Sequence, residues 1–226
     1  CKAGDTMKLG IVTIMDYGNY GNRLQNYALS HVLRKKFGCD AVSLASYQEK
    51  AFYNGHYVSW VKDHIAQMSC LFPSFAEKRF GPNMTRSTNF RRWSRKYIPT
   101  RNFYECSALS ESLNREFDMF FAGSDQIWNP DITYRLEPAY FGAFPQKDSA
   151  VTVSYAASLG KPALDAEYTE EFRELLKNVD VISVREETSL EYVAEQAGKE
   201  VRWMPDPTLL LTGAEWEKIA VDPKEK

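Results

Sequence analysis

The chain has 226 residues, of which 44% are hydrophobic and 26% charged, a composition typical of an ordinary globular protein. Its formal net charge of -2 argues against nucleic acid or an anionic membrane surface as the main partner. No apolar run approaches the roughly 20 residues that a membrane-spanning helix needs, so the sequence excludes a transmembrane segment.

The cysteines lie far apart and form no CxxC pair, at Cys1, Cys39, Cys70 and Cys106. This spacing indicates neither a zinc cluster nor a disulfide-rich secreted fold, so we expect a protein of the reducing cytoplasm. Six residues precede Met7, which we expect to be the natural start of the protein.

The first predicted unit is a strand, a loop and a helix. Residues 8–15 form a run rich in β-branched residues, which predicts a buried strand. After a polar, glycine-rich turn, apolar residues recur at helical spacing between 24 and 32. The basic run 34–36 and Gly38 are typical of a helix end, and a second strand is predicted over 41–45.

Residues 46–116 are less regular, and we interpret them as an insertion with helices near 60–68 and 88–97. A cluster of basic residues in this insertion could hold a phosphate or an acidic polymer, but a solvated helix face is the favoured interpretation. The cluster consists of Arg86, Arg91, Arg92, Arg95, Lys96 and Arg101.

Strands and helices alternate regularly after residue 116. Strands are predicted over 117–122, 150–155, 181–184 and 201–204, with helices preceding the third and fourth strands and the last helix ending at Gly198. We therefore expect an α/β fold over residues 7–212, a Rossmann-like lobe with a largely parallel sheet and helices on both faces. Ligands of such sheets collect at the carboxyl ends of the strands.

Three loops after predicted strands are richer in polar residues than a turn requires, and we expect them to share one edge of the sheet. The loop 16–22 has two glycines that let backbone amides approach a ligand, although Gly-Asn turns are also common structural elements. The loop GSDQIWNP at 123–130 combines a carboxylate, amides and an indole, which suits a sugar. Alternatively, Ser124 or Asp125 caps a helix and Trp128 packs in the core.

The third group of polar residues joins the loop 154–161 to the segment 183–189, again at strand ends. Arg185 is the residue of interest, because a guanidinium can hold a carboxylate or phosphate through paired hydrogen bonds. An ion pair with Glu186, Glu187 or another acid is the alternative, and spacing does not decide between them.

Five motifs in fixed order are GIVTIMDYGNYGNRLQNYALSHVL, FFAGSDQIWNP, VSYAASLGK, ISVREETS and MPDPTLLL. Together they resemble the amino-terminal half of the polysaccharide pyruvyl transferase family over most of residues 8–211, apart from the insertion. The resemblance implies a two-lobed fold similar to the GT-B glycosyltransferases. This chain would be the first lobe, with residues 213–226 beginning the linker to a second lobe.

The same resemblance implies a bacterial enzyme of surface-polysaccharide synthesis that moves pyruvate from phosphoenolpyruvate onto a saccharide acceptor as a ketal. It would be cytoplasmic, or peripheral to the inner face of the membrane. The family's basic and histidine-containing motifs are expected in the second lobe, so no catalytic role is assigned to His31, His56 or His64. A GT-B glycosyltransferase using a nucleotide sugar, or a sugar-binding lobe without catalysis, are the alternatives.

On this resemblance, Asp125 is the candidate base or cation stabiliser and Arg185 the candidate anion-binding residue. No metal or cofactor site is visible in the sequence. Candidate substrate contacts are Asn19, Tyr20, Gly21, Asn22, Gln25, Gly123, Ser124, Gln126, Trp128, Asn129 and Ser158. The isolated chain is expected to lack pyruvyl transfer, because one lobe supplies only one wall of the cleft.

Overall fold

The computed structural model describes residues 6–16, 18–46, 82–103, 115–144 and 146–220. Within them, one seven-stranded sheet has the order β3-β2-β1-β4-β5-β6-β7, and all neighbouring strands are parallel. The strands are β1 (Lys8–Val12), β2 (Asp40–Ser46), β3 (Thr100–Phe103), β4 (Met119–Asp125), β5 (Val151–Ala157), β6 (Ile182–Val184) and β7 (Val201–Trp203). The predicted α/β fold with a Rossmann-like parallel sheet is therefore confirmed.

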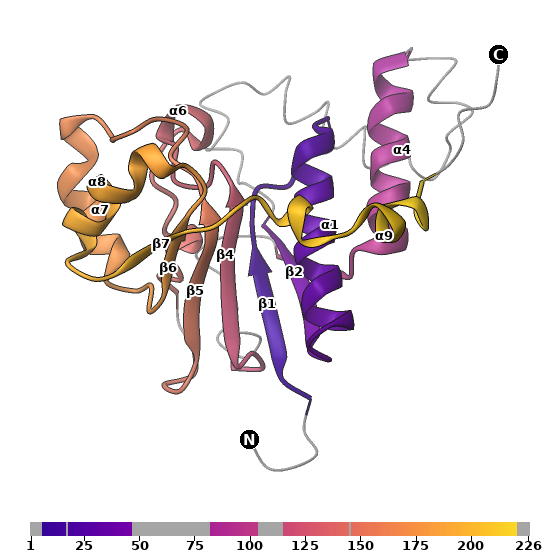
Figure 1. Cartoon of the computed structure of the whole chain (residues 1–226), viewed down its shortest axis with the longest axis horizontal. Coiled ribbons are helices and arrows are strands. Elements are labelled where there is room, and N and C mark those ends of the chain that lie inside the picture. The colour runs from indigo at the N-terminus through magenta and orange to yellow at the C-terminus, as the bar shows by residue number, and fades with distance from the viewer. Residues whose placement is uncertain (1–5, 17, 47–81, 104–114, 145, 221–226) are drawn as a thin grey trace.

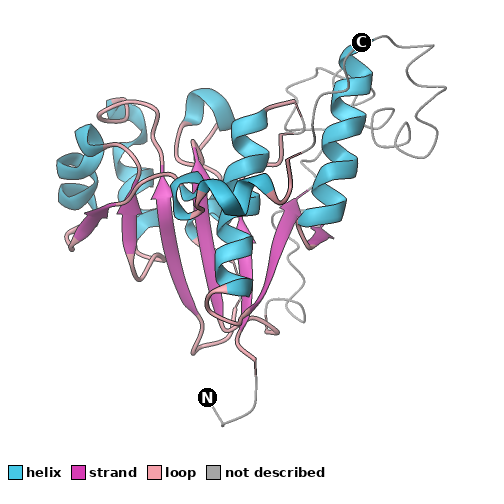
Figure 2. Cartoon of the chain, turned by 45° about the vertical axis from the view of Figure 1, so that its right-hand side comes forward, coloured by secondary structure: helices cyan, strands magenta, loops and turns pink. Residues whose placement is uncertain are grey.

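Helices connect these strands and cover the sheet (Figures 1 and 2). The α-helices are α1 (Tyr20–Lys35), α4 (Pro82–Tyr97), α6 (Pro130–Thr133), α7 (Thr169–Leu176), α8 (Leu190–Ala197) and α9 (Gly213–Glu217). Short 3-10 helices are η2 (Pro138–Phe141), η3 (Ala166–Tyr168), η4 (Glu187–Ser189) and η5 (Pro207–Leu210). In the described part of the chain, no helix is long and apolar enough to cross a membrane.

The two faces of the sheet pack against different helices, because side chains alternate along each strand. On one face, Leu9 and Ile11 of β1 pack with Leu29 and Leu33 of α1. On the other face, the cluster around Phe120 includes residues of η2, α7 and α8. Both faces are thus buried, as the near-continuous apolar sequence of the strands requires.

The segment after β7 crosses the outer side of α1. Figure 1 shows η5 and α9, in yellow, passing over α1 towards α4. Tyr27 and Val32 of α1 pack there with Leu211 and Trp216. Helix α1 is therefore buried from two sides, which explains why so much of its surface is inaccessible although it lies outside the sheet.

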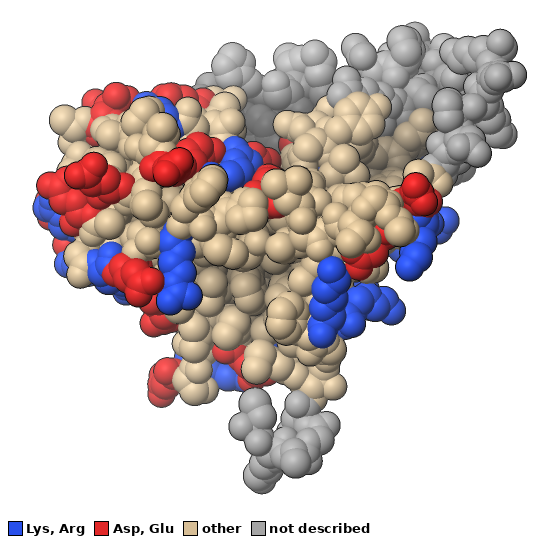
Figure 3. Space-filling view, viewed as in Figure 1, with Lys and Arg blue, Asp and Glu red and all other residues tan. Residues whose placement is uncertain are grey.

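The surface in this view carries charges of both signs. Figure 3 shows basic and acidic side chains interspersed over the α7 and α8 side, whereas much of the middle is uncharged. Interspersed charges of this kind are typical of a solvated surface.

The predicted elements agree with the structure except at some ends. The first strand stops at Val12 rather than residue 15, because Thr13 leaves the sheet and donates its hydroxyl to the carbonyl of Ser124 at 2.9 Å. Strand β4 continues to Asp125, three residues beyond the prediction, since Gly123 and Asp125 still pair with β5.

The predicted insertion is described only in part. Its second helix is α4, which begins at residue 82 rather than 88, and the first, near 60–68, lies outside the described residues. Strand β3 was not predicted, because its four residues TRNF carry little apolar character. It extends the sheet by pairing with β2.

Candidate functional site

The strand order places one pair of strands at a topological switch point. From β1 the chain builds the sheet outward through β2 and β3, and it then returns to place β4 on the other side of β1. The loops that leave β1 and β4 consequently diverge, and ligands of open α/β sheets bind in the crevice between such loops. The candidate site is therefore expected at the carboxyl ends of β1 and β4.

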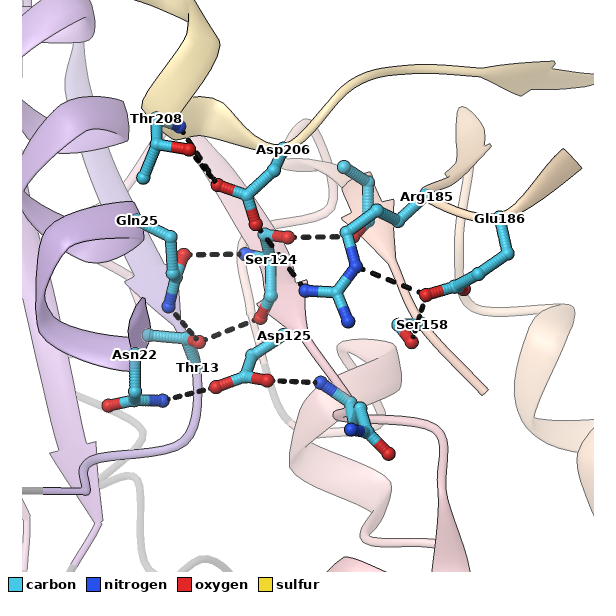
Figure 4. Close-up of polar contacts among 12 residues, drawn as sticks. Thr13, Asn22, Gln25, Ser124, Asp125, Ser158, Arg185, Glu186, Asp206 and Thr208 are labelled. Atoms are coloured by element: carbon cyan, nitrogen blue, oxygen red, sulfur yellow. Dashed lines mark hydrogen bonds and ion pairs between the residues drawn. The ribbon is translucent and has the colours of Figure 1, made fainter. Parts of the chain in front are cut away.

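The three polar loops meet at this edge of the sheet, as predicted. The side chain of Asn22 donates from Nδ2 to Oδ2 of Asp125 at 2.5 Å, which joins the first loop to the second. The backbone N–H of Ser158 donates to the carbonyl of Asp125 at 3.0 Å, which joins the third loop to the second. Figure 4 shows these groups around Asp125.

Asp125 is the half-buried acid at the centre of this edge. Its Oδ1 accepts the N–H of Gln126 at 2.8 Å, and its Oδ2 accepts from Asn22, so both oxygens are oriented. The backbone of Asp125 has φ 77°, in the left-handed region that residues other than glycine seldom adopt. Such conformations gather at functional sites, where the surrounding structure holds them.

Gly123 lets β4 approach β5 closely just before this acid. Its φ is 117°, and a Cβ atom there would lie 2.4 Å from the carbonyl oxygen of Tyr155. The peptide between Gly123 and Ser124 is cis. Gly123 is thus needed for the backbone path, and its contact with a ligand stays a prediction.

Ser124 and Gln25, two predicted substrate contacts, are instead engaged with each other. Gln25 accepts the N–H of Ser124 at 3.2 Å and donates to the hydroxyl of Thr13 at 3.1 Å. Thr13 in turn donates to the carbonyl of Ser124, which closes a ring of hydrogen bonds. Because Ser124 is 0% exposed and Gln25 2%, both hold the backbone before Asp125 rather than face a ligand.

Trp128 does not offer its indole to a sugar. Its side chain is 0% exposed, stacks on Phe141 with ring centroids 5.3 Å apart and donates to the carbonyl of Tyr140 at 3.1 Å. The alternative of core packing therefore holds, because a large aromatic ring buries more apolar area inside than at a wet surface. Asn129 caps α6 by accepting the N–H of Asp131, so it too has a structural role.

Arg185 lies at the end of β6 between two carboxylates. Its Nε donates to Glu186 at 3.1 Å and its Nη1 lies 3.4 Å from Asp206, so the alternative ion pairs are present. Ser158 is buried and donates its hydroxyl to the same Glu186 oxygen at 2.7 Å. Asp206 is anchored in turn by the backbone and side chain of Thr208.

The remaining predicted contacts lie closer to solvent. Asn19 caps α1 by accepting the N–H of Asn22 at 3.2 Å, and Gly21 is exposed beside it. Tyr20 is 59% exposed and packs edge to face on Phe90 of α4, with centroids 4.4 Å apart. Gln126 is half-buried and accepts from Asn129. Tyr20 therefore offers the most aromatic surface among the predicted contacts.

One ionisable group near Asp206 is perturbed. Burial raises the pKa of the Tyr155 phenol, and the negative charge of Asp206 raises it further. The phenol therefore stays protonated at neutral pH and is available as a hydrogen-bond donor.

The described basic residues of the insertion lie on α4 and β3. On α4, Arg92, Arg95 and Lys96 are exposed, as the favoured interpretation of a solvated helix face expects. Arg101 pairs with Glu116 at 2.9 Å, and the side chain of Arg86 lies outside the described ones.

Of the three histidines, His31 lies among the described residues. His31 contacts Tyr27 on α1, with 3.1 Å between Nδ1 and the phenol oxygen, while His56 and His64 lie outside the described residues. Within the described ranges, no three His, Cys, Asp or Glu side chains are grouped so as to hold a metal ion.

Sequence reasoning missed four residues that shape the site. These are Thr13, Arg23, Glu186 as a partner of Ser158, and Asp206. Thr13 and Asp206 were visible only as polar residues at strand ends, and Arg23 as a charge in a helix that is otherwise rich in apolar and amide residues. Residues of these kinds are usually solvated, so their burial could not be inferred from type.

Comparison with known proteins agrees with the motifs. A search among curated proteins found no match. A protein-family model described as Polysaccharide pyruvyl transferase matches residues 19–226, which include Asn22, Asp125 and Arg185. The chain therefore belongs to the polysaccharide pyruvyl transferase family.

Proposed function

We propose that the protein transfers pyruvate from phosphoenolpyruvate to hydroxyl groups of a saccharide, forming a ketal. The observation that carries this proposal is the position of Asp125 at the switch point between β1 and β4, in a chain of this family. A carboxylate held there can accept a proton from a sugar hydroxyl or stabilise a neighbouring cation.

In the proposed reaction, the methylene carbon of phosphoenolpyruvate is protonated, and the adjacent carbon becomes a cation that still carries the phosphate. A sugar hydroxyl attacks this carbon while Asp125 accepts its proton. Phosphate then leaves, and a second hydroxyl attacks the same carbon to close the ketal. The two hydroxyl protons are balanced by the one added to the methyl group and the one released with phosphate.

Arg185 is the proposed contact to the anionic groups of the donor. Its Nε and Nη1 already bond to Glu186 and Asp206, so a substrate would approach the remaining nitrogen, which points away from both carboxylates in Figure 4. Holding the planar guanidinium on two sides fixes its orientation, which favours binding of a phosphate or carboxylate from the third side.

The charge of this site supports a two-lobed enzyme. Three carboxylates gather at the site, those of Asp125, Glu186 and Asp206. The guanidinium groups beside them are those of Arg185 and of the buried Arg23, which is bonded to Asn22. The donor itself carries both a phosphate and a carboxylate. Further cations are needed to hold such a donor. We propose that they come from a second lobe and that the protein acts in the cytoplasm.

The acceptor would lie against the exposed side of the site. Tyr20 presents an aromatic surface for a sugar face, while Asn19 and Gln126 carry amides for its hydroxyl groups. Together with the exposed Gly21, these three residues are the predicted contacts that remain accessible.

The experiment is to supply the protein of natural length with phosphoenolpyruvate and a panel of glycans, and to follow phosphate release and the mass of the glycan. Ketal product with equal release of phosphate supports the proposal. Turnover with a nucleotide sugar instead would identify a glycosyltransferase, and glycan binding without either reaction would identify a binding lobe.

The 226-residue chain by itself is expected to give no ketal in the same assay. One lobe leaves the reacting groups open to water, and the orientation lost can be worth roughly 7–11 kcal/mol of the barrier. Ketal formed by this chain alone would show that no second lobe is required.

A further inference from the structure

Arg23 is a buried charge that the proposed reaction does not use. It follows Asn22 in the first turn of α1, and only 1% of its surface is exposed. A guanidinium is always charged, so its burial requires strong hydrogen-bond acceptors. The chain just after β1 supplies one strong acceptor, the carbonyl of Ile14, to which Nη2 donates at 2.7 Å, and one weak acceptor, the sulfur of Met15, to which Nη1 donates at 2.9 Å.

A further acceptor is the side chain of Asn22. Both Nε, at 2.9 Å, and Nη2 of Arg23 donate to Oδ1 of Asn22. The backbone N–H of Asp16 donates to the same oxygen at 2.9 Å. On its other side, Asn22 donates from Nδ2 to Asp125.

These neighbours allow one orientation of the Asn22 amide. A guanidinium and a backbone N–H can only donate, whereas a carboxylate can only accept. If the amide were turned over, its NH₂ group would face the donors of Arg23 and its oxygen would face the oxygen of Asp125. The hydrogen-bond partners of Asn22 therefore determine which end of its side-chain amide is the oxygen and which is the NH₂ group.

We propose that Arg23 is a positioning residue that acts on Asp125 through Asn22. By holding the oxygen of the amide, Arg23 keeps the NH₂ group directed at Oδ2 of Asp125, while the N–H of Gln126 holds Oδ1. The carboxylate is thereby fixed in rotation at the switch point. The importance of this orientation for catalysis rests on the proposed function. If Asp125 is catalytic, its misplacement by about 1 Å can lower the rate roughly 10²-fold.

The first test reads the amide itself and needs no substrate. In nitrogen-15 NMR spectra, the side-chain amide signal of Asn22 is assigned by its loss in Asn22→Ala. Arg23→Lys keeps a charge but cannot donate two bonds to one oxygen, so we expect the Asn22 amide protons to exchange with water about tenfold faster, as after loss of one hydrogen bond. Arg34→Lys, exposed near the end of the same helix, is the control and should change nothing.

Unchanged exchange in a folded Arg23→Lys protein would overturn the proposal. Should Arg23→Lys not fold, Asp125→Ala tests the same series of hydrogen bonds from its other end. Loss of the acceptor should also speed exchange of the Asn22 amide protons. Unchanged exchange in Asp125→Ala would likewise refute the arrangement. Neither measurement depends on pyruvyl transfer, so failure here is distinct from failure of the proposed function.

The second test is a double-mutant cycle in the protein of natural length. We expect Arg23→Lys to lower kcat by about 10²-fold, with little change in KM for phosphoenolpyruvate. In the Asn22→Ala background, the same change of Arg23 should have little further effect, because the connection to Asp125 is already broken. If the two losses multiply, Arg23 acts independently of Asn22 and the proposal is wrong.

Discussion

The change of Asp125 to asparagine tests the site most directly, because it keeps the size of the side chain and removes its charge. In the structure, both oxygens of Asp125 accept hydrogen bonds, from the N–H of Gln126 and from Nδ2 of Asn22. Asparagine has one acceptor oxygen, so one of these two donors would face an NH₂ group. The left-handed backbone is no obstacle, since asparagine adopts it readily.

Two separate losses are expected from Asp125→Asn. Loss of a hydrogen bond to a charged group should lower the free energy of unfolding by about 1.5–3 kcal/mol. Loss of a general base should lower the rate of ketal formation by about 10²–10⁴-fold. The protein should therefore remain folded at room temperature while its turnover nearly disappears.

The assay combines urea unfolding with phosphate release from phosphoenolpyruvate, both on the protein of natural length. Asp148→Asn is the matched control, because Asp148 is exposed in the turn before β5, at the opposite end of that strand from the site. This control should change neither quantity. If Asp125→Asn keeps normal turnover while its stability falls, then Asp125 only supports the backbone and the proposed role is refuted.

Three further changes test the structure around the site. Gly123→Ala should lower the free energy of unfolding by about 3 kcal/mol or more, because its Cβ would meet the carbonyl of Tyr155. Gly213→Ala, with open space around it, should leave that free energy nearly unchanged in urea unfolding. Trp128→Phe should lower the free energy of unfolding by about 1–3 kcal/mol without changing KM for either substrate. A raised KM for the acceptor would instead indicate that the indole contacts the sugar. Burial lowers the pKa of His31, so the unfolded chain binds the proton more readily and stability should fall as pH drops through about 6.5. In His31→Gln the loss of stability between pH 7.5 and 5.5 should be smaller than in the wild type, and an equal loss would contradict this assignment.

The parallel arrangement of the strands and the edge that carries the site were predictable from sequence. Apolar runs such as 117–122 can be buried only as strands of a covered sheet, and helical spacing between them requires parallel crossovers. Once the strands are parallel, the loops after them must share one edge, which is why the contact between Asn22 and Asp125 could be expected.

The direction of individual side chains was not predictable in the same way. Trp128 and Asp125 lie three residues apart in one loop, yet the indole is buried and the carboxylate is half-exposed. The difference depends on Phe141 and Tyr140, which occupy the space beneath the loop and arrive from a later part of the chain. Residue type alone cannot show which polar or aromatic group finds such a partner.

The sequence by itself determined the fold class, the family and the edge of the sheet where the polar loops gather, because hydrophobic periodicity and motif order are local properties of the chain. Only the tertiary structure decided which polar residues face a ligand and which support the backbone. Gln25 and Ser124 were expected to bind substrate but satisfy each other, while Arg23 was overlooked and orients the amide that contacts Asp125. The physical reason is that a buried hydrogen-bonding group must find its partner in space. Gln25 and Ser124 lie about a hundred residues apart in sequence, and so do Asn22 and Asp125.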